Sequence, residues 1–356
     1  MRVIPKELLD KIRLIAPGTK LRKALDDIIR ANFGALIFFT DDITKYKDII
    51  QGGFELNTPF SPERLYELSK MDGAIVVNED ITKILYANVH LVPDASISTT
   101  ETGTRHRTAE RVAKQTGKMV IAVSRRRNII TLYYKSYKYV VNETSFLIIR
   151  VNQAISTLEK YRVNFDRFLS SLDAMELENR VTLQDVMRVV EKGLMILKIH
   201  EELKPYLIEI GDEGRLAIMQ VNELIEDVDD IVELLIMDYA NEEIDERTAE
   251  DIIEKFIKEK EISQISIARA MGYDVQQTSQ LSDITLSARG YRILKYVARI
   301  PLNVSYNVVR AFKNIEAISR ASLDQLKSVE GIGDKRAKAI SEGISSLRYR
   351  KTQVTE

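Results

Sequence analysis

The chain has 356 residues, 45% of them hydrophobic, which is the composition of a globular protein and more than one ordinary core can hold. It contains no cysteine, so disulfides, thiolate metal sites and cysteine nucleophiles are excluded. Three scattered histidines are too few for a zinc site built from histidine, and the apolar runs are too short for a membrane span or a signal peptide. We therefore expect a cytoplasmic protein of two or three domains with no membrane partner.

Charge is distributed unevenly along the chain, although the formal net charge is only −1. Residues 1–142 hold 23 Lys+Arg against 16 Asp+Glu, a balance of +7. Residues 143–285 hold 15 against 31, a balance of −16, and residues 286–356 hold 14 against 6, a balance of +8. This asymmetry predicts three domains with these boundaries, of which the two basic ends bind anions.

Residues 1–142 alternate between helical and strand-like patterns. Two amphipathic helices are predicted before residue 32, and strands are predicted at 34–40, 74–77, 84–92, 119–124, 129–134 and 139–141. Such alternation is typical of a mixed α/β domain whose central sheet is covered by helices. The domain contains neither the G-x-x-x-x-G-K-[ST] nor the G-x-G-x-x-G pattern, so a nucleotide site in it has to be built from other residues.

One stretch, ETGTRHRTAER at residues 101–111, combines a helix start with clustered cations. Thr104 is a good N-cap, and a helix is predicted from about Arg105 to Gln115. Its first turn then carries Arg105, His106 and Arg107. The partial positive charge of a helix N-terminus disfavours cations there, whereas a bound phosphate would favour them. A solvated charged turn is the alternative interpretation.

A second stretch, LYELSKMDGAIVVNED at residues 65–80, places a carboxylate before a buried strand. A helix that starts with Ser61 as N-cap and Pro62 in its first turn leads into it. Asp72-Gly73 is a predicted tight turn in front of the strand 74–77. A carboxylate beside a glycine can hold a divalent metal while a ligand approaches the backbone. An ordinary turn without a function is the alternative.

Together the two stretches resemble the catalytic signatures of the diadenylate cyclase family, DGA at residues 72–74 and GTRHRTA at 103–109. The flanks KMDGAIV and TRHRTAERVAKQTG extend the resemblance. It implies synthesis of cyclic di-AMP from two ATP molecules, with release of two pyrophosphates and a need for Mg²⁺ or Mn²⁺. It also implies that Asp72 binds the metal and helps to activate the 3′-hydroxyl, that Gly73 lets the nucleotide pack against the backbone, and that Leu91 contacts the adenine.

The resemblance assigns the phosphates to five residues of the second signature: Thr104, Arg105, His106, Arg107 and Thr108. Ser124 is a weaker ATP-binding candidate. Arg127, in the predicted hairpin turn at 125–128, would stabilise charge on the leaving group. For His106 we favour a phosphate contact over a role as general base, because Asp72 with its metal is better placed for that role in the family.

The middle of the chain reads as helical. Nine apolar residues spaced alternately by four and three form an unbroken heptad pattern, which predicts one helix of about 30 residues: Leu147, Val151, Ala154, Leu158, Tyr161, Phe165, Phe168, Leu172 and Met175. Further helices are predicted from Thr182 to about His200, from about Gly214 to Tyr239, and from Thr248 to Ile257. Acidic clusters on them, such as Asp229-Asp230, are typical of a solvated face.

The last segment contains LDQLKSVEGIGDKRAKAI at residues 323–340, which resembles a helix-hairpin-helix motif with its hairpin at Gly331-Ile332-Gly333. The two glycines let the backbone approach a DNA phosphate, and N–H groups at the start of the second helix bind it without reading bases. Three side chains add positive charge: Lys335, Arg336 and Lys338. A looser copy at 298–312 lacks the glycines, and we expect it to pack against the second copy.

The three parts in this order resemble the DNA-integrity scanning branch of the family over nearly the whole chain. The resemblance implies a multidomain α/β plus all-α protein: a mixed-sheet nucleotide-binding (diadenylate cyclase) domain, an elongated helical bundle spine and a C-terminal helix-hairpin-helix domain. It further implies binding of branched DNA, a nucleoid-associated location and an octamer with paired cyclase domains. The two-fold symmetry of the product independently calls for two sites facing each other across an isologous interface.

Two other function classes remain open from the sequence. A non-catalytic DNA-binding protein could use the first domain only to sense ATP. Asp72 together with the intact Arg105-His106-Arg107 turn favours the enzyme, because a sensor needs no metal carboxylate. An accessory module of a DNA polymerase or ligase would explain the hairpin but would leave residues 1–142 without a function.

Overall fold

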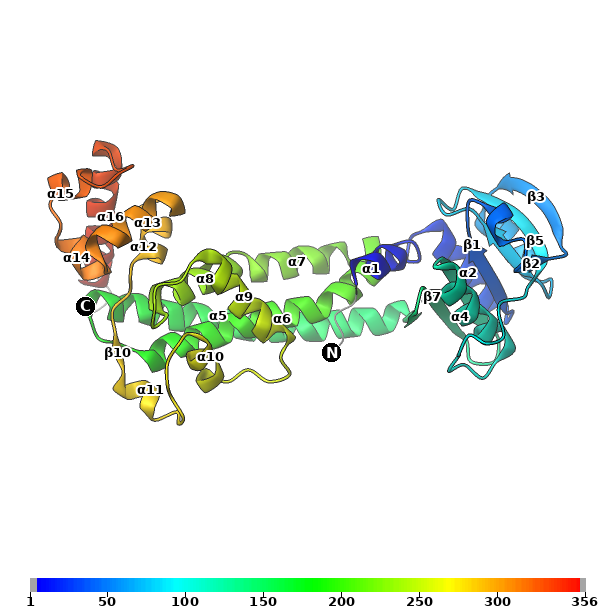
Figure 1. Ribbon diagram of the computed structural model, residues 1–356, viewed down its shortest axis with the longest axis horizontal. Helices are drawn as coiled ribbons and strands as arrows, with labels where there is room; N and C mark the ends of the chain where they lie inside the picture. The colour runs from blue at the N-terminus through cyan, green and yellow to red at the C-terminus, as the bar shows by residue number, and fades with distance from the viewer. Residues whose placement is uncertain (1–4, 353–356) are drawn as a thin grey trace. The chain divides into compact units, whose positions relative to one another are not determined.

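The structure is a computed structural model that describes residues 5–352 (Figure 1). The chain forms two compact units. The first contains the residues up to 153 together with 203–218, and the second contains 154–202 and the residues from 219 onwards.

The first unit is built on a mixed sheet, as the sequence predicts, but the sheet has eight strands rather than the six expected, because β2 and β3 were not predicted. Its strand order is β2-β5-β4-β1-β6-β7-β8, with β3 paired to β5, and only the β1–β4 pair is parallel. The strands are β1 (Ala35–Phe39), β2 (Ile50–Gln51), β3 (Phe54–Pro59), β4 (Ala74–Val77), β5 (Lys83–Leu91), β6 (Met119–Ser124), β7 (Ile129–Tyr134) and β8 (Tyr137–Val140). The helices are α1 (Lys6–Arg13), α2 (Lys20–Arg30), η1 (Ile43–Tyr46), α3 (Pro62–Leu68) and α4 (Thr104–Thr116).

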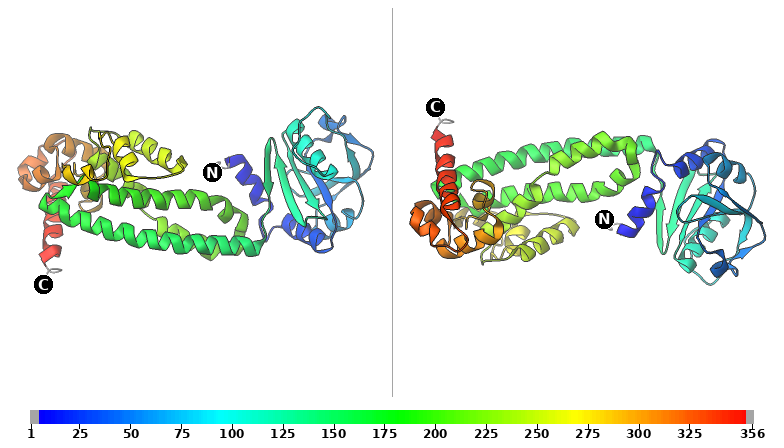
Figure 2. Two further views of the ribbon diagram at one scale, coloured as in Figure 1. Left: turned by 90° about the horizontal axis from the view of Figure 1, so that it is seen from below. Right: turned by 90° about the horizontal axis from the view of Figure 1, so that it is seen from above.

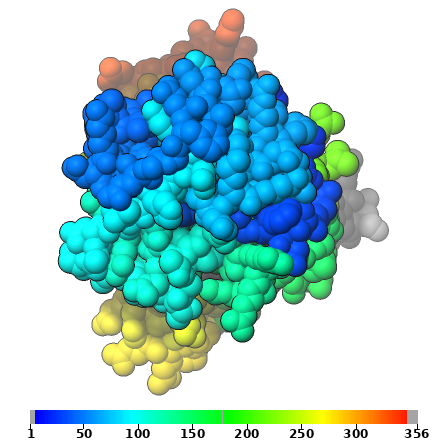
Figure 3. Space-filling view, turned by 90° about the vertical axis from the view of Figure 1, so that its right-hand side faces the viewer, coloured from blue at the N-terminus to red at the C-terminus, as the bar shows by residue number. Residues whose placement is uncertain are grey.

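Helices cover both faces of this sheet (Figure 2). Alternate strand residues point to opposite faces, so Ile37 packs on the side of α1, α2 and α3, while Phe38 packs on the side of α4. In Figure 3 the segments that contain β3 and β5 (blue) and the loop before α4 (cyan) form the near face of the unit. The result is a three-layer α/β/α domain.

Two local predictions in this unit have clear outcomes. Ser61 caps α3 by accepting the N–H of Arg64 at 3.2 Å, and Pro62 is in the first turn, as predicted. The prediction of Thr104 as N-cap of α4 is wrong by one residue, because Gly103 occupies that position and Thr104 is already helical. The helix therefore begins without a side-chain cap, which leaves its first N–H groups for another acceptor.

A buried carboxylate fixes the chain where it leaves β8. Glu209 accepts hydrogen bonds from the Tyr139 hydroxyl at 2.7 Å and from the backbone and side-chain amides of Asn142 at 2.6 and 2.7 Å. The Asn142 carbonyl in turn accepts from a guanidinium nitrogen of Arg22 at 3.1 Å. Glu209 is fully buried, so these bonds replace the water that its carboxylate gives up.

The helical part contains α5 (Thr144–Glu178), α6 (Leu183–Ile210), η2 (Gly211–Gly214), α7 (Arg215–Ile225), α8 (Val228–Tyr239), α9 (Glu246–Lys258), α10 (Gln264–Ala270) and α11 (Gln280–Asp283), with β9 (Val181–Thr182) paired to β10 (Thr285–Leu286). The long helix predicted from the heptad pattern is α5. One row of that pattern is buried at Val151, Leu158, Phe165 and Leu172, whereas the other row is only partly buried at Ala154, Tyr161, Phe168 and Met175.

Two predicted boundaries in this region are wrong. The helix expected from Gly214 to Tyr239 is two helices, α7 and α8, because Asp227 has a left-handed φ of 61° between them. Asp tolerates that conformation better than most residues do. The helix expected to end near His200 continues to Ile210 with Pro205 inside it, so α6 tolerates the loss of one backbone hydrogen bond.

The last five helices are α12 (Tyr291–Tyr296), α13 (Leu302–Phe312), α14 (Ile315–Arg320), α15 (Leu323–Lys327) and α16 (Asp334–Thr352). They form two helical hairpins, α12–α13 and α15–α16. Gly331 has a φ of 86° in the second, and Arg299 has a φ of 53° before α13 in the first. The prediction that the two copies pack together is confirmed, because Val304 contacts Gly331 and the Asn307 side chain donates to the Glu330 carbonyl at 3.2 Å.

Buried charges join α12 to the helices before it. One carboxylate oxygen of Asp238 accepts the N–H groups of Gly290 and Tyr291, both at 2.7 Å, at the start of α12. The guanidinium of Arg292 pairs with Glu176 at 2.7 Å and with Asp173 at 2.6 Å. Burial alone would lower the pKa of Arg292, but Glu176 and Asp173 raise it above its ordinary value, so the guanidinium stays charged.

We predict that Arg292→Ala lowers the free energy of unfolding by about 3–5 kcal/mol, because the Glu176 carboxylate would stay buried without its partner. Urea unfolding followed by circular dichroism measures the loss. Lys295→Ala on the same helix is the matched control. Its partner Asp230 is half exposed, so we expect a loss below about 1 kcal/mol. Equal losses in the two variants would contradict the structural role of the buried pair.

Candidate functional site

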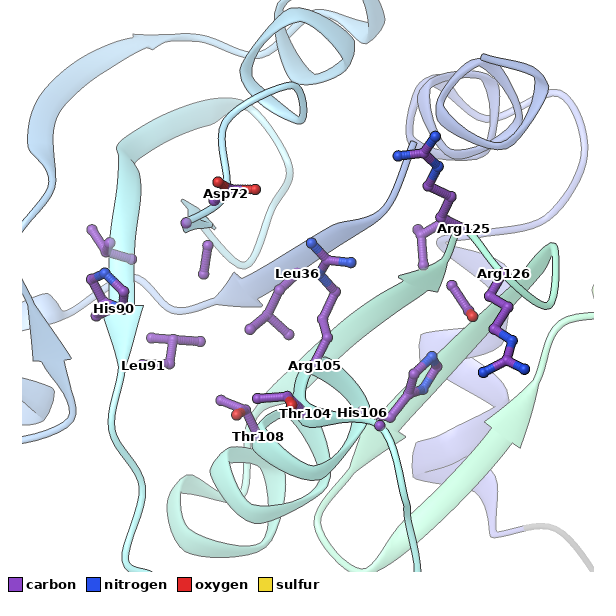
Figure 4. A pocket seen from close by; sticks show the side chains of 16 residues that line it. Leu36, Asp72, His90, Leu91, Thr104, Arg105, His106, Thr108, Arg125 and Arg126 are labelled. Carbon is purple, nitrogen blue, oxygen red and sulfur yellow. The ribbon is translucent and has the colours of Figure 1, made fainter. Parts of the chain in front are cut away.

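A pocket of about 560 Å³ lies in the first unit, where the start of α4 meets the sheet (Figure 4). Eight of the residues that the sequence singled out line it: Asp72, Gly73, Leu91, Thr104, Arg105, His106, Thr108 and Ser124. Two do not, Arg107 and Arg127, and the pocket wall contains the neighbours of Arg127, Arg125 and Arg126, instead. The structure thus brings residues from β4, β5, α4 and β6 together around one cavity.

The Asp72-Gly73 turn is fitted closely against β5. The N–H of Gly73 donates to the Asn88 side-chain oxygen at 3.2 Å, and a Cβ on Gly73 would lie 2.5 Å from the Asn88 backbone. Asn88 itself has a φ of 54° in a stretch where the β4–β5 register shifts. Only glycine therefore fits at 73, and this contact holds the exposed Asp72 at the pocket. Asn88 carries no motif, so the sequence did not indicate it.

An apolar wall lies beside that turn. Leu91 is buried at the end of β5, and Leu36, Val89 and Val123 also line the pocket. Such a surface suits a flat aromatic ring, which an adenine base provides. His90 is exposed on β5 and also lines the pocket.

The uncapped start of α4 forms the opposite wall. In Figure 4 the side chain of Arg105 projects from this helix towards the centre of the pocket. Its guanidinium lies over Gly34, where a Cβ would be 2.3 Å from Nη1 of Arg105. Gly34 therefore gives the guanidinium its room, which no sequence pattern indicated. Free N–H groups with a guanidinium beside them form a strong anion site.

The arginines of the β6–β7 turn differ in whether they line the pocket. Arg125 and Arg126 line the pocket, while the backbone N–H of Arg127 donates to the Ser124 hydroxyl at 3.3 Å. The sequence shows three consecutive arginines in a turn, and a turn has no periodicity from which to infer which side chains face inward. Arg125 and Arg126, together with Arg105, concentrate positive charge on one side of the cavity.

His106 is the most deeply buried titratable group of the pocket, with 5% of its surface exposed. Its Nδ1 lies 2.9 Å from the Tyr133 hydroxyl, which donates to a carboxylate oxygen of Glu101 at 2.9 Å. The ammonium of Lys138 lies 2.5 Å from the same carboxylate oxygen. Burial lowers the pKa of His106, and the charges of Arg127, Lys138 and Arg105 lower it further, against the raising effect of Glu101.

The second unit contains the predicted hairpin. Gly331 and Gly333 are exposed before α16, with open space around a Cβ at 333. Ile332 is buried and anchors the turn, as do two residues of the following helix, Ala337 and Ile340. Lys335, Arg336 and Lys338 are exposed, although Arg336 donates to the Gly331 carbonyl at 2.6 Å. The hairpin thus exposes a backbone turn and a cationic helix start, which suit a phosphate chain.

Three family models match the chain in succession. Residues 22–137 match the DisA bacterial checkpoint controller nucleotide-binding domain, and residues 141–280 match the linker region of the same controller. Residues 314–342 match the helix-hairpin-helix motif. No helix in the part of the chain that the structure describes is long and apolar enough to cross a membrane.

Several curated proteins are similar over nearly their whole length, each bearing the name DNA integrity scanning protein DisA. The relative from Thermotoga petrophila is 68% identical over 98% of this chain and 99% of its own. The relative from Thermotoga maritima is also 68% identical, over 98% of both chains, and one from Clostridium botulinum is 44% identical over 96% of both. The chain therefore belongs to the DisA family and is a nucleotidyltransferase, a diadenylate cyclase.

Proposed function

We propose that this chain condenses two ATP molecules into cyclic di-AMP and releases two pyrophosphates. The observation that carries the proposal is that the Asp72 carboxylate, the apolar wall at Leu91 and the uncapped start of α4 all line the same pocket. In each half-reaction a bond forms between a ribose 3′-oxygen and an α-phosphorus, the bond from that phosphorus to pyrophosphate breaks, and the hydroxyl proton is released.

The reaction of this family requires a divalent metal, and we propose Mg²⁺ or Mn²⁺ held by Asp72. Within residues 5–352 no three His, Asp or Glu side chains are grouped to hold an ion. One exposed carboxylate fits all the same, because Mg²⁺ usually binds through one or two carboxylates and completes its shell with phosphate oxygens and water. The ion would neutralise phosphate charge and make the α-phosphorus more electrophilic.

The chain's own residues would orient the nucleotide. Leu91 and its apolar neighbours would hold the adenine, and the N–H groups at the start of α4 would receive the phosphates. Thr104, Thr108 and Ser124 add hydroxyl donors on the same walls. We assign stabilisation of the leaving pyrophosphate to Arg125 and Arg126, because these two side chains line the pocket and Arg127 does not.

The product requires two pockets. Each ATP supplies one attacking hydroxyl and one attacked phosphorus, so two sites related by a two-fold axis satisfy both reactions at once. We propose that cyclase domains pair face to face in a homo-octamer. The exposed backbone turn and cationic start of α16 support a second function, binding of branched DNA through its phosphates, which would bring the protein to the nucleoid.

Asp72→Asn should abolish formation of cyclic di-AMP and leave the fold intact, because it keeps the shape of the side chain and removes the charge that holds the metal. Chromatography of products from ATP and Mn²⁺ measures turnover, and circular dichroism checks the fold. Asp80→Asn, an exposed carboxylate outside the pocket wall, is the control and should keep wild-type turnover. Near-normal turnover of Asp72→Asn would contradict the role of Asp72 as the metal ligand.

Arg105→Ala should weaken ATP binding by about tenfold or more, since a hydrogen bond to a charged group contributes about 1.5–3 kcal/mol. Arg107→Ala removes the same charge from the same helical turn but lies outside the pocket wall, so we expect a smaller effect. Calorimetry with a non-hydrolysable ATP analogue compares the two. An equal loss of affinity in both variants would show that the summed electrostatic field of the two arginines, rather than a direct contact with Arg105, holds the phosphates.

Gly333→Asp should weaken DNA binding by about tenfold or more, because a carboxylate would replace phosphate at the start of α16. The site has open space, whereas Gly331 has a left-handed φ and lies against Val304, so 333 is the safer position. Ser322→Asp adds the same charge as the cap of α15 and is the matched control. Fluorescence anisotropy with a four-way junction at fixed salt measures both.

The same variants test coupling between the two functions. A bound junction should slow the cyclase of the wild-type protein and of Ser322→Asp, and should leave the rate of Gly333→Asp unchanged. A junction that slows Gly333→Asp as strongly as the wild type would separate the hairpin from regulation.

A further inference from the structure

The His106 side chain has one nitrogen in use and one without a partner. Nδ1 lies at hydrogen-bonding distance from Tyr133, whereas Nε2 is buried and makes no hydrogen bond to any residue that the structure describes. A buried polar atom without a partner costs about 1–3 kcal/mol, so it is rarely kept without a use. His106 is one of the residues that line the nucleotide pocket, so a ligand bound there could supply the missing partner.

The positions of the protons on His106 and Tyr133 can be assigned by starting from Glu101, the last acceptor in the series His106–Tyr133–Glu101. The Glu101 side chain is 5% exposed, and burial would raise its pKa, but hydrogen bonds from Lys138 and Tyr133 outweigh burial and lower it. The carboxylate is therefore ionised and can only accept. Burial and the neighbouring Glu101 raise the pKa of Tyr133, so the phenol keeps its proton and donates it to Glu101.

The Tyr133 oxygen then has only lone pairs left for His106, so Nδ1 of His106 must carry the proton in that hydrogen bond. Because burial lowers the pKa of His106, the imidazole is neutral and its Nε2 is an unprotonated acceptor. A neutral histidine side chain in water populates two tautomers. In this protein the ionised Glu101 selects one of them, because it fixes the direction of the hydrogen bond between Tyr133 and His106.

We propose that Tyr133 and Glu101 are positioning residues that hold His106 as the Nδ1–H tautomer and reserve its Nε2 for the nucleotide. The assignment of the ligand rests on the function proposed above, whereas the tautomer does not. An unprotonated Nε2 accepts a hydrogen bond from a hydroxyl of the substrate. With the proton that this hydroxyl releases on forming its bond to phosphorus, Nε2 becomes a donor to a phosphate, and Glu101 stabilises the resulting imidazolium through Tyr133, as a carboxylate does behind a catalytic histidine.

The tautomer is measured directly by solid-state NMR of the full-length protein labelled with ¹⁵N in its histidine side chains. The spectrum of His106→Gln identifies the His106 signals among those of three histidines. We expect an unprotonated Nε2 and a protonated Nδ1 in the nucleotide-free wild type. Tyr133→Phe removes the acceptor of the Nδ1 proton, so the Nε2–H tautomer should gain population. Glu101→Gln should shift the tautomers in the same direction.

Kinetics supply the second measurement. Tyr133→Phe should lower kcat by about 10- to 100-fold, the range typical of partners that orient a functional histidine. The control is Tyr134→Phe, the next residue of β7, which packs on the opposite face of the sheet and lies outside the nucleotide pocket. It should keep the wild-type kcat and the wild-type KM for ATP.

Each measurement can overturn the proposal. A protonated Nε2 in the wild type, or a tautomer unchanged by Tyr133→Phe, would show that Tyr133 and Glu101 do not determine which nitrogen of His106 carries the proton. A kcat of Tyr133→Phe equal to that of Tyr134→Phe would show that the tautomer does not serve the reaction. Absence of cyclic di-AMP from the wild type would instead refute the proposed function and leave the tautomer assignment to stand on the NMR result.

Discussion

The site depends on an electrostatic mismatch at the first turn of α4. This helix has Gly103 at its N-cap position, without a side-chain cap, and places Arg105 and Arg107 where its own dipole is positive. Neither the missing cap nor the cations stabilise the helix, and both favour an anion. The cost is met by packing, because Ala109, Val112 and Ala113 bury the other side of α4 against the sheet. The sheet therefore supplies the stability that lets the helix start remain a binding site.

Two absent side chains shape the pocket as much as the residues that line it. Gly73 lets its turn lie against Asn88, and Gly34 leaves space for the Arg105 guanidinium. In both places a Cβ would come within 2.5 Å of another atom, which is closer than real packing permits. The Asp72 carboxylate and the Arg105 guanidinium at the pocket are thus positioned by contacts that involve no charge.

Sequence alone predicted the elements with strong local signals. The hairpin of β6 and β7 was predicted at its observed bounds because two apolar runs flank a polar turn, and α5 was predicted from its heptads. The missed features have non-local causes. The left-handed φ of Asp227 separates α7 from α8, and no sequence pattern indicated it. The sequence also did not show that Arg125 and Arg126, rather than Arg127, line the pocket. Tyr133, the partner of His106, lies 27 positions away on a strand, and Glu101, which accepts from Tyr133, lies 5 positions away on a loop, so only the fold brings the three together.

The buried charges around α12 bear on how the hairpin domain is attached. If a flexible tether joined the hairpins to the helices before them, the two parts could move independently of each other. Here Asp238 of α8 accepts backbone N–H groups at the start of α12, and Glu176 of α5 pairs with Arg292 where water does not reach. Displacing α12 would expose uncompensated charges, which is costly, so a force on the hairpins is passed to α5 and α8 rather than absorbed between them. The carboxylates inside this unit thus hold the hairpins to the helices that carry them.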